Sequence, residues 1–450
     1  MNALTQYIDL FRQNRAAIDA HSAPALNAAR TAALALLEKV GRLPDRGDEG
    51  FEKTSVNDMF APDFGVNIER RDLPADVAAS FRCGVPNLST LLGLVVNDRF
   101  AATPALLKNL PDGVDVCSLA QAVRQWPDFV ADYYAKLSSA SQGTSASHAA
   151  LNTLLCQDGV FIRVAPGVRL EKAIQLVDIF QSQFPLMAVR RVLLVAGEGS
   201  SVSVLKCDHT RPDSQNGLSS EVVEIFAGPG ASVQWYDIEE SSPATSRYSQ
   251  LFARQDDGSS LTVCASTLAN GTTRNEFHLD VVGEHTVTRL SGMAIGSGEQ
   301  HIDNSSDLRH AGFYGYSSQM FKYVLDDDAT GAFEGSIEVC HGARFVEAYQ
   351  TNRNILASRS ARMHTKPQLL IYNDDVKCSH GATTGQLDDR ALFYMQTRGI
   401  PLAVARRMLM QAFMADVIDA IELEPLRSRL LHMVECRFAG HPASCGECSR

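Results

Sequence analysis

Two residues in the stretch from Lys366 to Ile400 are of types that can bind a metal ion together. Cys378 and His380 stand two positions apart, shortly after an apolar run that is typical of a strand. Because side chains of a strand alternate between its faces, an extended segment here places Cys378 and His380 on one face, with their Cα atoms roughly 6.6 Å apart. Lys377 and Ser379 would then point to the other face. A thiolate and an imidazole on one face can share a soft metal ion.

An ordinary structural role explains the same two residues. A cysteine packs well as a small hydrophobic side chain, and a histidine is satisfied by hydrogen bonds. Residue types and spacing by themselves leave both interpretations open.

The C-terminal tail holds a second group of metal-binding residue types. Cys436, His441, Cys445 and Cys448 supply the number of ligands that a structural zinc site needs. Their spacing matches none of the common zinc modules, and chain ends are frequently frayed. A frayed tail without a metal is therefore the competing interpretation.

Motifs of the common enzyme classes are absent from the sequence. The chain has no G-x-x-x-x-G-K-[ST], no G-x-S-x-G, no H-E-x-x-H and no G-x-G-x-x-G at a strand-to-helix turn. Adjacent carboxylates occur at 326–328, 374–375 and 388–389, and we interpret them as solvated turns, because adjacent strand residues point to opposite faces. Cys340 and His341 are also adjacent and would point to opposite faces of a strand. We therefore interpret this pair as structural and not as a metal site.

Composition restricts the partners that we expect. The chain has 450 residues, of which 45% are hydrophobic and 21% charged, as in ordinary soluble proteins. A formal net charge of −11 argues against nonspecific binding to nucleic acid or to an anionic membrane. The sequence shows no apolar window near the ~20 residues of a membrane helix and no signal-peptide core. We interpret the cysteines as free thiols, which are typical of a reducing compartment, and therefore expect a cytoplasmic protein.

A weak repeat after residue 151 predicts the element that positions Cys378 and His380. A glycine, two residues and then alternating apolar residues recur from Gly199, Gly230 and Gly258, at intervals of about 30 residues. Glycine supplies corners with positive φ, and stacked coils bury the one apolar face of each coil. The repeat predicts a β-solenoid, with a stack of antiparallel β-sandwich domains as the alternative.

Helical spacing of apolar residues dominates the first part of the chain. Breaker residues and a run of serines interrupt it. The expected helices cover residues 1–40, 101–110 and 127–137, with an exposed loop at 43–50 and a linker at 138–147.

Helical spacing returns from about residue 402. These C-terminal helices are expected either to cap the end of the solenoid or to dock a partner. The predicted division is an N-terminal helical region over 1–150, a β-helix core over 151–398 and a C-terminal helical region over 399–450.

Several longer motifs carry a resemblance to a known family. They are Asp158-Gly-Val-Phe-Ile-Arg-Val-Ala-Pro-Gly167, Phe333-Glu-Gly-Ser-Ile-Glu-Val339, Gln350-Thr-Asn-Arg-Asn354 and, as the most specific, Asp375-Val-Lys-Cys-Ser-His380-Gly-Ala-Thr with Arg398-Gly-Ile400. The chain resembles the SUF iron–sulfur cluster assembly scaffold family (SufB/SufD) over about residues 150–435, and is most similar to its D type.

The resemblance implies a mixed α and β protein with a right-handed parallel β-helix between two helical regions. It also implies pairing with a SufB-like subunit through the last coils, and docking of a SufC-like ATPase on the C-terminal helices. A transient iron–sulfur cluster would form at the interface with the SufB-like subunit. His380 matches the family's D-side candidate iron ligand, and Cys378 is a weaker companion.

Departures from the B type of the family are informative. The B type carries Glu-His-Glu where this chain has Ser379-His380-Gly381, and cysteines where it has Asn352 and Met395. The thiols expected at the cluster would therefore come from the partner. A reduced flavin accompanies some such complexes, but this sequence contains no flavin fingerprint.

The expected function is thus that of a scaffold subunit which is not itself an enzyme. A β-helix polysaccharide lyase or hydrolase is the alternative, although the cytosolic type of cysteine usage and the lack of a signal peptide count against it. A purely structural interaction protein, with His380 unused, is the third hypothesis. Cluster type, the full ligand set and a homodimer of the isolated chain are left open.

Overall fold

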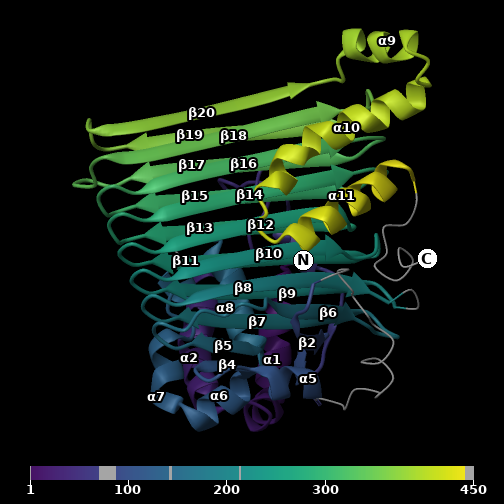
Figure 1. Cartoon of the computed structure of the whole chain (residues 1–450). Helices are drawn as coiled ribbons and strands as arrows, with labels where there is room; N and C mark the ends of the chain where they lie inside the picture. The colour runs from purple at the N-terminus through teal and green to yellow at the C-terminus, as the bar shows by residue number, and fades with distance from the viewer. Residues whose placement is uncertain (1, 70–87, 141–143, 212–213, 441–450) are drawn as a thin grey trace.

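The computed structural model describes residues 2–69, 88–140, 144–211 and 214–440. Most of its strands form a β-solenoid in which the chain passes alternately between two sheets (Figure 1). From β5 onward, odd-numbered strands join one sheet and even-numbered strands the other, and their pairings are parallel. The predicted parallel β-solenoid is confirmed, and the alternative of antiparallel sandwiches is wrong.

The two sheets of the solenoid are called here the odd sheet and the even sheet. The odd sheet consists of β4 (Val114–Ser118), β5 (Val160–Val164), β7 (Leu186–Ala196), β9 (Gly217–Ala227), β11 (Thr245–Gln255), β13 (Thr272–Val281), β15 (His301–His310), β17 (Thr330–Val339) and β19 (Arg362–Ile371), with β1 (Gly65–Val66) beside β7. The even sheet consists of β3 (Arg99–Ala102), β2 (Leu91–Val96), β6 (Ile174–Phe180), β8 (Ser201–Thr210), β10 (Ser232–Glu240), β12 (Ser260–Ala269), β14 (Val287–Gly296), β16 (Tyr316–Leu325), β18 (Val346–Leu356) and β20 (Val376–Gly385).

The repeated glycines stand at one corner of successive coils. Gly199, Gly230 and Gly258 have φ values of 63°, 64° and 65°, in the left-handed region that glycine adopts without a Cβ penalty. The N–H of each donates to a carbonyl of the next coil, as from Gly230 to Asp257 at 2.7 Å. The corner both turns the chain and ties adjacent coils together.

Later coils place aromatic residues at the same corner. His285, Tyr314 and Phe345 have φ values of 53°, 56° and 57°, and their N–H groups continue the same series of hydrogen bonds. Their rings stack, with centroids 4.7 Å apart for the first pair and 5.0 Å for the second. The glycine pattern therefore fades from the sequence after Gly258 although the corner geometry continues.

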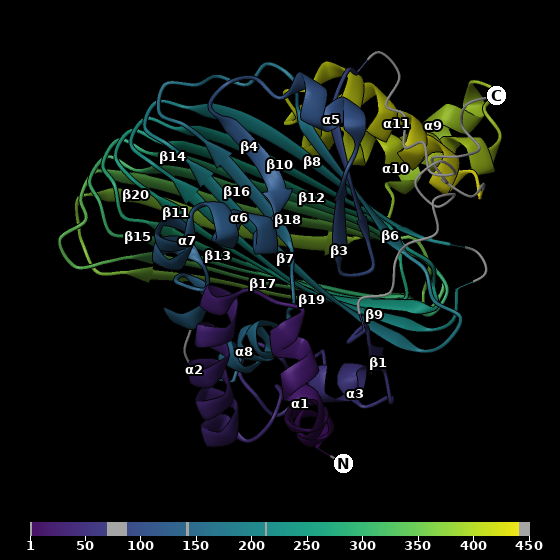
Figure 2. The same ribbon diagram turned by 90° about the horizontal axis from the view of Figure 1, so that it is seen from below.

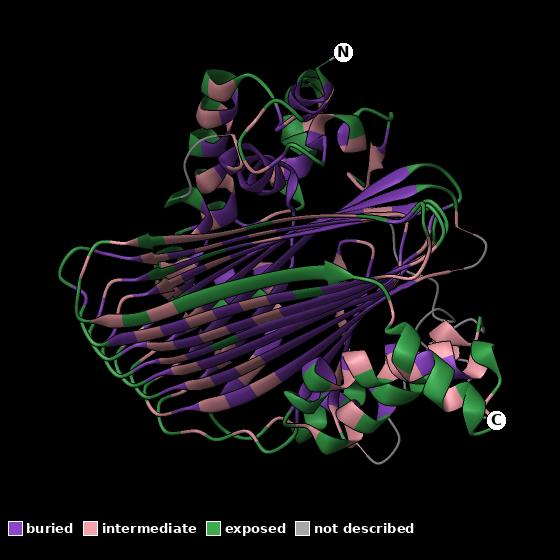
Figure 3. Ribbon diagram, turned by 90° about the horizontal axis from the view of Figure 1, so that it is seen from above, coloured by how far each residue is buried: buried purple, intermediate pink, exposed green. Residues whose placement is uncertain are grey.

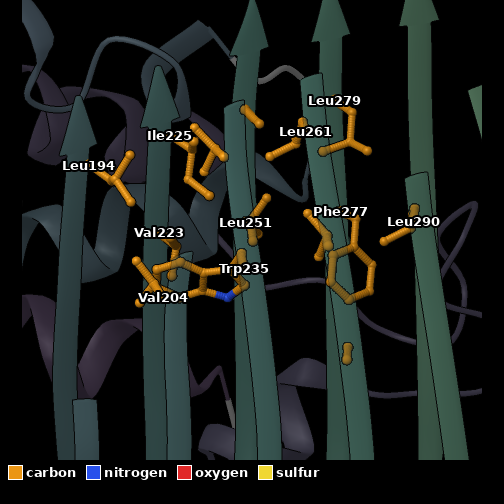
Figure 4. Close-up of a cluster of buried hydrophobic side chains, with 14 of the residues drawn as sticks. Leu194, Val204, Val223, Ile225, Trp235, Leu251, Leu261, Phe277, Leu279 and Leu290 are labelled. Carbon is orange, nitrogen blue, oxygen red and sulfur yellow. The ribbon is translucent and has the colours of Figure 1, made fainter. Parts of the chain in front are cut away.

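Side chains between the two sheets form the main core. Trp235 is 1% exposed and lies among aliphatic residues such as Val204, Val223 and Leu251 (Figure 4). Every second residue of a strand enters this core, so the alternation of apolar residues that the repeat shows is the physical reason for the solenoid.

The N-terminal part covers the outer face of the odd sheet and the first coils (Figure 2). Its helices are α1 (Ala3–Ala20), α2 (Pro24–Val40), α3 (Val56–Phe60), α5 (Pro104–Asn109), α6 (Leu119–Gln125), α7 (Pro127–Tyr133) and α8 (Ala146–Leu155), with a 3-10 turn η1 (Ser138–Ala140).

Three expectations for this part need correction. The segment 101–110 starts in β3 and becomes helical only after Thr103, whose side chain caps α5. The helix expected over 127–137 ends at Tyr133, before Ala135 with its φ of 58°. The segment 138–147 is not a linker where it is described, because it contains η1 and the start of the buried α8.

The first 150 residues are also not purely helical. Strand β2 pairs in parallel with β6, and β4 pairs antiparallel with β5. These two pairings join strands that are far apart in the sequence, which a local pattern does not reveal. The division at residues 150 and 398 stays a prediction.

The C-terminal helices are α9 (Asp389–Thr397), α10 (Leu402–Asp419) and α11 (Glu424–Phe438). Helices α10 and α11 pack on the outer face of the even sheet, where Met414 and Leu430 contact a cluster that includes Tyr236 and Met293. They cover a side of the solenoid, so the expectation that they cap its end is wrong. In the part of the chain that the structure describes, no further strand pairs with β19 or β20 at that end.

Candidate functional site

The open end of the solenoid is an edge strand. Strand β20 is the last member of the even sheet and pairs with β18 on one side only, among the described residues. Figure 3 shows β20 as a mainly exposed strand beside buried ones. An unpaired row of backbone N–H and C=O groups is a template for a further strand or chain.

Strand alternation places the two candidate ligands as the sequence predicts. In the register with β18, Cys378 lies beside Ala348 and His380 beside Gln350, and both neighbours are buried. Lys377 takes the opposite face, where its Nζ is 2.8 Å from Glu347. Cys378 and His380 therefore share the face of β20 that continues the solenoid interior.

His380 is exposed at this end. It is the outermost member of a column that contains Gln319 in β16 and Gln350 in β18. Its imidazole is thus accessible to a ligand or partner, and it stands on a regular strand whose position is fixed by backbone pairing with β18.

Cys378 has a different environment. Its side chain is half-buried and packs against the main core. Burial raises the pKa of the Cys378 thiol, which disfavours the thiolate that binds metals, while a hydrogen bond from the Ala348 backbone acts weakly in the opposite direction. The structure thus supports the core role of Cys378 more directly than a ligand role.

The described residues do not form a complete metal site. No group of three or more His, Cys, Asp or Glu side chains that could hold a metal ion occurs in the described ranges. In the tail, Cys436 lies in α11 with its Sγ 3.6 Å from His432 Nε2, and the other tail candidates, His441, Cys445 and Cys448, lie outside the described residues. The zinc hypothesis for the tail stays a prediction.

The positions where the B type has cysteines are separated in the fold. Asn352 is buried inside β18, where it donates to the Phe321 carbonyl at 3.2 Å. Met395 lies on α9, beyond the last strand. Neither residue can supply a thiolate from this chain.

The adjacent carboxylates at 326–328 and 374–375 lie between strands, as the sequence predicts, whereas Asp388 and Asp389 begin helix α9, so their assignment to a turn is wrong. Asp326 and Asp327 occupy the turn between β16 and β17, and Asp388 caps α9 by accepting from the Arg390 N–H at 2.9 Å. The pair Cys340-His341 also lies in a turn, so the assumption that it belongs to a strand is wrong; the His341 ring packs 4.8 Å from Tyr372.

Helix α9 follows β20 and extends past the last strands at the top of Figure 1. Phe393 and Tyr394 on this helix are 69% and 59% exposed. A groove of about 280 Å³ separates the helix from the body, lined by residues that include Leu356, Leu392 and Arg406. Exposed aromatic side chains beside the edge strand of a sheet are typical of a protein interface.

The sequence did not predict that Gln350 lies beside His380. Gln350 belongs to the Gln350-Thr-Asn-Arg-Asn354 motif and lies one coil before His380, but only the register shows that the two are neighbours. Gln319, Gln350 and His380 follow one another in the sequence at intervals of about one repeat. This spacing could have indicated that they lie side by side on successive coils.

Comparisons with known proteins identify the family. A model described as "SUF system FeS cluster assembly, SufBD core domain" matches residues 179–413, and one described as "SufBD protein N-terminal region" matches residues 1–176. The first covers more than half of the chain, so the chain belongs to the SufBD family of the SUF system.

Individual relatives point to the D type. The chain is 27% identical to an iron–sulfur cluster assembly SufBD family protein of Synechocystis over 88% of each chain. It is 27% identical to the Bacillus subtilis iron–sulfur cluster assembly protein SufD over 76% of this chain and 78% of the relative. Its identity to the Escherichia coli SufD protein is 34% over 38% of this chain and 41% of the relative. The similarity to SufD confirms the family resemblance of the motifs. Among the described residues, no helix is long and apolar enough to cross a membrane.

Proposed function

We infer that this chain is a SufD-like scaffold subunit of a cytoplasmic SUF complex, without catalytic activity of its own. It pairs with a SufB-like subunit through β19, β20 and α9, and a nascent iron–sulfur cluster forms at this interface. A SufC-like ATPase docks on the C-terminal helices and drives changes at the interface. The cluster is the cargo of the complex, so the site has to release it.

The observation that carries the proposal is the exposed His380 on an edge strand that pairs on one side only, among the described residues. A neutral imidazole is a good ligand for iron near pH 7. One ligand from this chain and thiolates from a partner make a site that opens when the subunits move, unlike a four-cysteine site within one chain.

Exposed apolar residues support the docking of an ATPase subunit. Leu402 and Met408 on α10 and Leu431 on α11 are 47%, 45% and 42% exposed. The opposite sides of these helices are fixed to the even sheet, as in the bond from Lys322 Nζ to the Phe413 carbonyl at 2.7 Å. A partner bound here is therefore coupled to the strands that lead to β20.

Two further proposals concern the isolated chain and its cofactors. Without the SufB-like subunit, the edge of β20 is free to pair with a second copy, so a homodimer is expected. A reduced flavin in the assembled complex has no support from the described residues. The polysaccharide lyase or hydrolase alternative also has none, because the chain belongs to the SufBD family.

Replacement of His380 tests the proposal. In cells that depend on this system, we expect His380→Ala to lower the activity of iron–sulfur enzymes at least tenfold, because the cluster loses a ligand while β20 keeps its backbone pairing. Ser379→Ala is the matched control, since Ser379 lies on the opposite face of the same strand. Normal enzyme activity with His380→Ala at equal protein level would show that His380 is not a ligand.

A further inference from the structure

A column of side chains runs inside the solenoid and ends at His380. In-register pairing places Gln319 of β16 beside Gln350 of β18, and Gln350 beside His380 of β20. Neighbouring strands lie about 4.8 Å apart, so aligned side chains on one face are within hydrogen-bonding reach of one another. The column thus links a buried amide pair to the exposed imidazole.

The amide pair is held firmly by its surroundings. Gln350 Nε2 donates to Gln319 Oε1 at 3.0 Å, and the Ser306 hydroxyl donates to the same oxygen at 2.8 Å. Gln319 and Gln350 are 1% and 2% exposed. Ser306 is likewise buried.

The backbone opposite the pair makes room for it. A Cβ atom at Gly335 would lie only 2.3 Å from Gln350 Nε2, so the amide of Gln350 occupies the space that a side chain at position 335 would need. This contact explains why glycine stands in the middle of the Phe333–Val339 motif. It also restricts the amide of Gln350 to one location.

Two atoms of this buried network lack a hydrogen-bond partner, Gln319 Nε2 and Gln350 Oε1, and the second belongs to the residue beside His380. Gln350 Oε1 is buried and has no hydrogen bond, although its own Nε2 is paired. A buried acceptor without a donor is unfavourable. Native proteins rarely contain such an acceptor unless a further group donates a hydrogen bond to it. The next member of the column is His380, whose ring carries an N–H on at least one nitrogen.

We propose that Gln350 is a positioning residue for His380. Its Oε1 accepts a hydrogen bond from one ring N–H of His380, which fixes the tautomer and leaves the lone pair of the other nitrogen directed at the subunit interface. Metal-binding histidines in proteins are generally held in this way by an acceptor on the second nitrogen. The inference rests on the proposed ligand role of His380 and adds the residue that prepares the ring for iron.

The test uses the tautomer of His380 in the metal-free full chain. Histidine labelled with ¹⁵N is incorporated, long-range ¹H–¹⁵N correlations report which ring nitrogen carries the proton, and the spectrum of His380→Ala assigns the signal. We expect one dominant tautomer for His380 in the parent chain. In Gln350→Leu we expect the mixed pattern of an exposed imidazole, for which His21 in the same chain is the reference.

Two further variants separate positioning from general damage to the core. Gln350→Glu, as the neutral acid, keeps an acceptor oxygen and also a donor toward Gln319 Oε1, and should restore the single tautomer. Asn352→Leu alters another buried amide of β18, which lies beside Ala382 and not beside His380, and should leave the tautomer unchanged. If Gln350→Leu does not fold, Gln350→Met takes its place with the same expected result.

Several outcomes would overturn the inference. A parent chain without a dominant tautomer, a Gln350→Leu chain with an unchanged tautomer, or a Gln350→Glu chain that resembles Gln350→Leu would each do so. So would a bond in which Gln350 donates from its amide nitrogen, because that bond would block the ring nitrogen instead of freeing it.

Cluster maturation in cells distinguishes this inference from the proposed function. Normal maturation with His380→Ala would remove the ligand role even if the tautomer depends on Gln350. Failed maturation with His380→Ala, together with an unchanged tautomer in Gln350→Leu, would preserve the ligand role and overturn positioning. If His380 is a ligand and Gln350 positions it, Gln350→Leu lowers cluster maturation several-fold and Gln350→Glu restores much of it.

Discussion

Cys378 and His380 lie on the same face of β20 but differ in burial. His380 is exposed, whereas Cys378 is half-buried against the core. The alternation of strand side chains predicted their common face, because that property depends only on the period of a strand. Their different environments depend on neighbouring coils, which the local sequence does not contain.

Replacement of Cys378 should therefore have a much smaller effect than replacement of His380. We expect Cys378→Ala to keep at least half of the cluster maturation of the parent chain, because its side chain contributes mainly to packing. The measurement is iron–sulfur enzyme activity in the same cells, at equal protein level. A loss equal to that of His380→Ala would instead make Cys378 a second ligand.

The corner of each coil is the element that defines the solenoid. Its glycines were visible in the sequence as a repeat, but the same corner with His285, Tyr314 and Phe345 was not, because residues other than glycine uncommonly adopt positive φ. The sequence also did not predict strands β2 and β4. They pair with β6 and β5, which are far from them in the sequence.

A methyl group at a glycine corner tests this element. Gly230 has a φ of 64°, so Gly230→Ala should lower the free energy of unfolding by about 1 kcal/mol through backbone strain. A Cβ at Gly230 would make only ordinary contacts, the nearest at 3.8 Å, so steric overlap adds little. Chemical denaturation measures the effect.

Gly381→Ala is the control for this comparison. Gly381 lies in exposed β20, and no atom would come within 4 Å of a Cβ there. We expect no measurable loss of stability for this variant. Equal stability of both variants would argue against strain at the corner.

At the scale of the whole molecule, buried histidines couple stability to pH. His148 is fully buried between the N-terminal part and the odd sheet, with its ring nitrogens 2.9 Å from Gln250 Oε1 and 3.0 Å from Ser220 Oγ. Burial lowers the pKa of His148 to about 4, and the hydrogen bond that Gln250 Oε1 accepts from the ring offsets this only in part. The pKa values of His209 and His310 are likewise lowered to about 4 by burial.

The sign of the pH effect follows from these values. An unfolded histidine titrates near pH 6.5, so the unfolded chain takes up a proton at a higher pH than the folded chain does. The contribution of neutral His148 to stability is complete above pH 6.5 and is lost as the pH falls toward 4. Between pH 7.5 and 5, we expect the unfolding free energy of the parent chain to fall more than that of His148→Gln. Parallel pH profiles of the two chains would contradict this account.

The C-terminal helices connect the solenoid to its proposed ATPase partner. Met408→Asp with Leu431→Asp should abolish co-purification of a SufC-like ATPase, because a charge is introduced on each of two exposed apolar positions. The fold should persist, since neither side chain is in the core. Leu107→Asp on α5 is the matched control, because Leu107 is 61% exposed and lies far from these helices in sequence. Retained binding by the double variant would move the docking surface elsewhere.

The parallel β-solenoid and the face that carries His380 were predictable because periodic patterns and a specific motif determine them. The open end was not, because the C-terminal helices pack on the side of the solenoid through contacts such as that of Arg437 with the Leu268 carbonyl at 2.8 Å. His380 stands at that end. Our central claim is that it is a ligand of a cluster shared between two subunits.

Pulsed electron paramagnetic resonance of the assembled complex tests this claim most directly. Only this chain would carry ¹⁵N-labelled histidine, and the complex with SufB-like and SufC-like subunits would be loaded and chemically reduced without oxygen. We predict a ¹⁵N hyperfine coupling to the cluster that disappears in His380→Ala. A loaded, paramagnetic complex without this coupling, or with the same coupling in His380→Ala, would contradict the account.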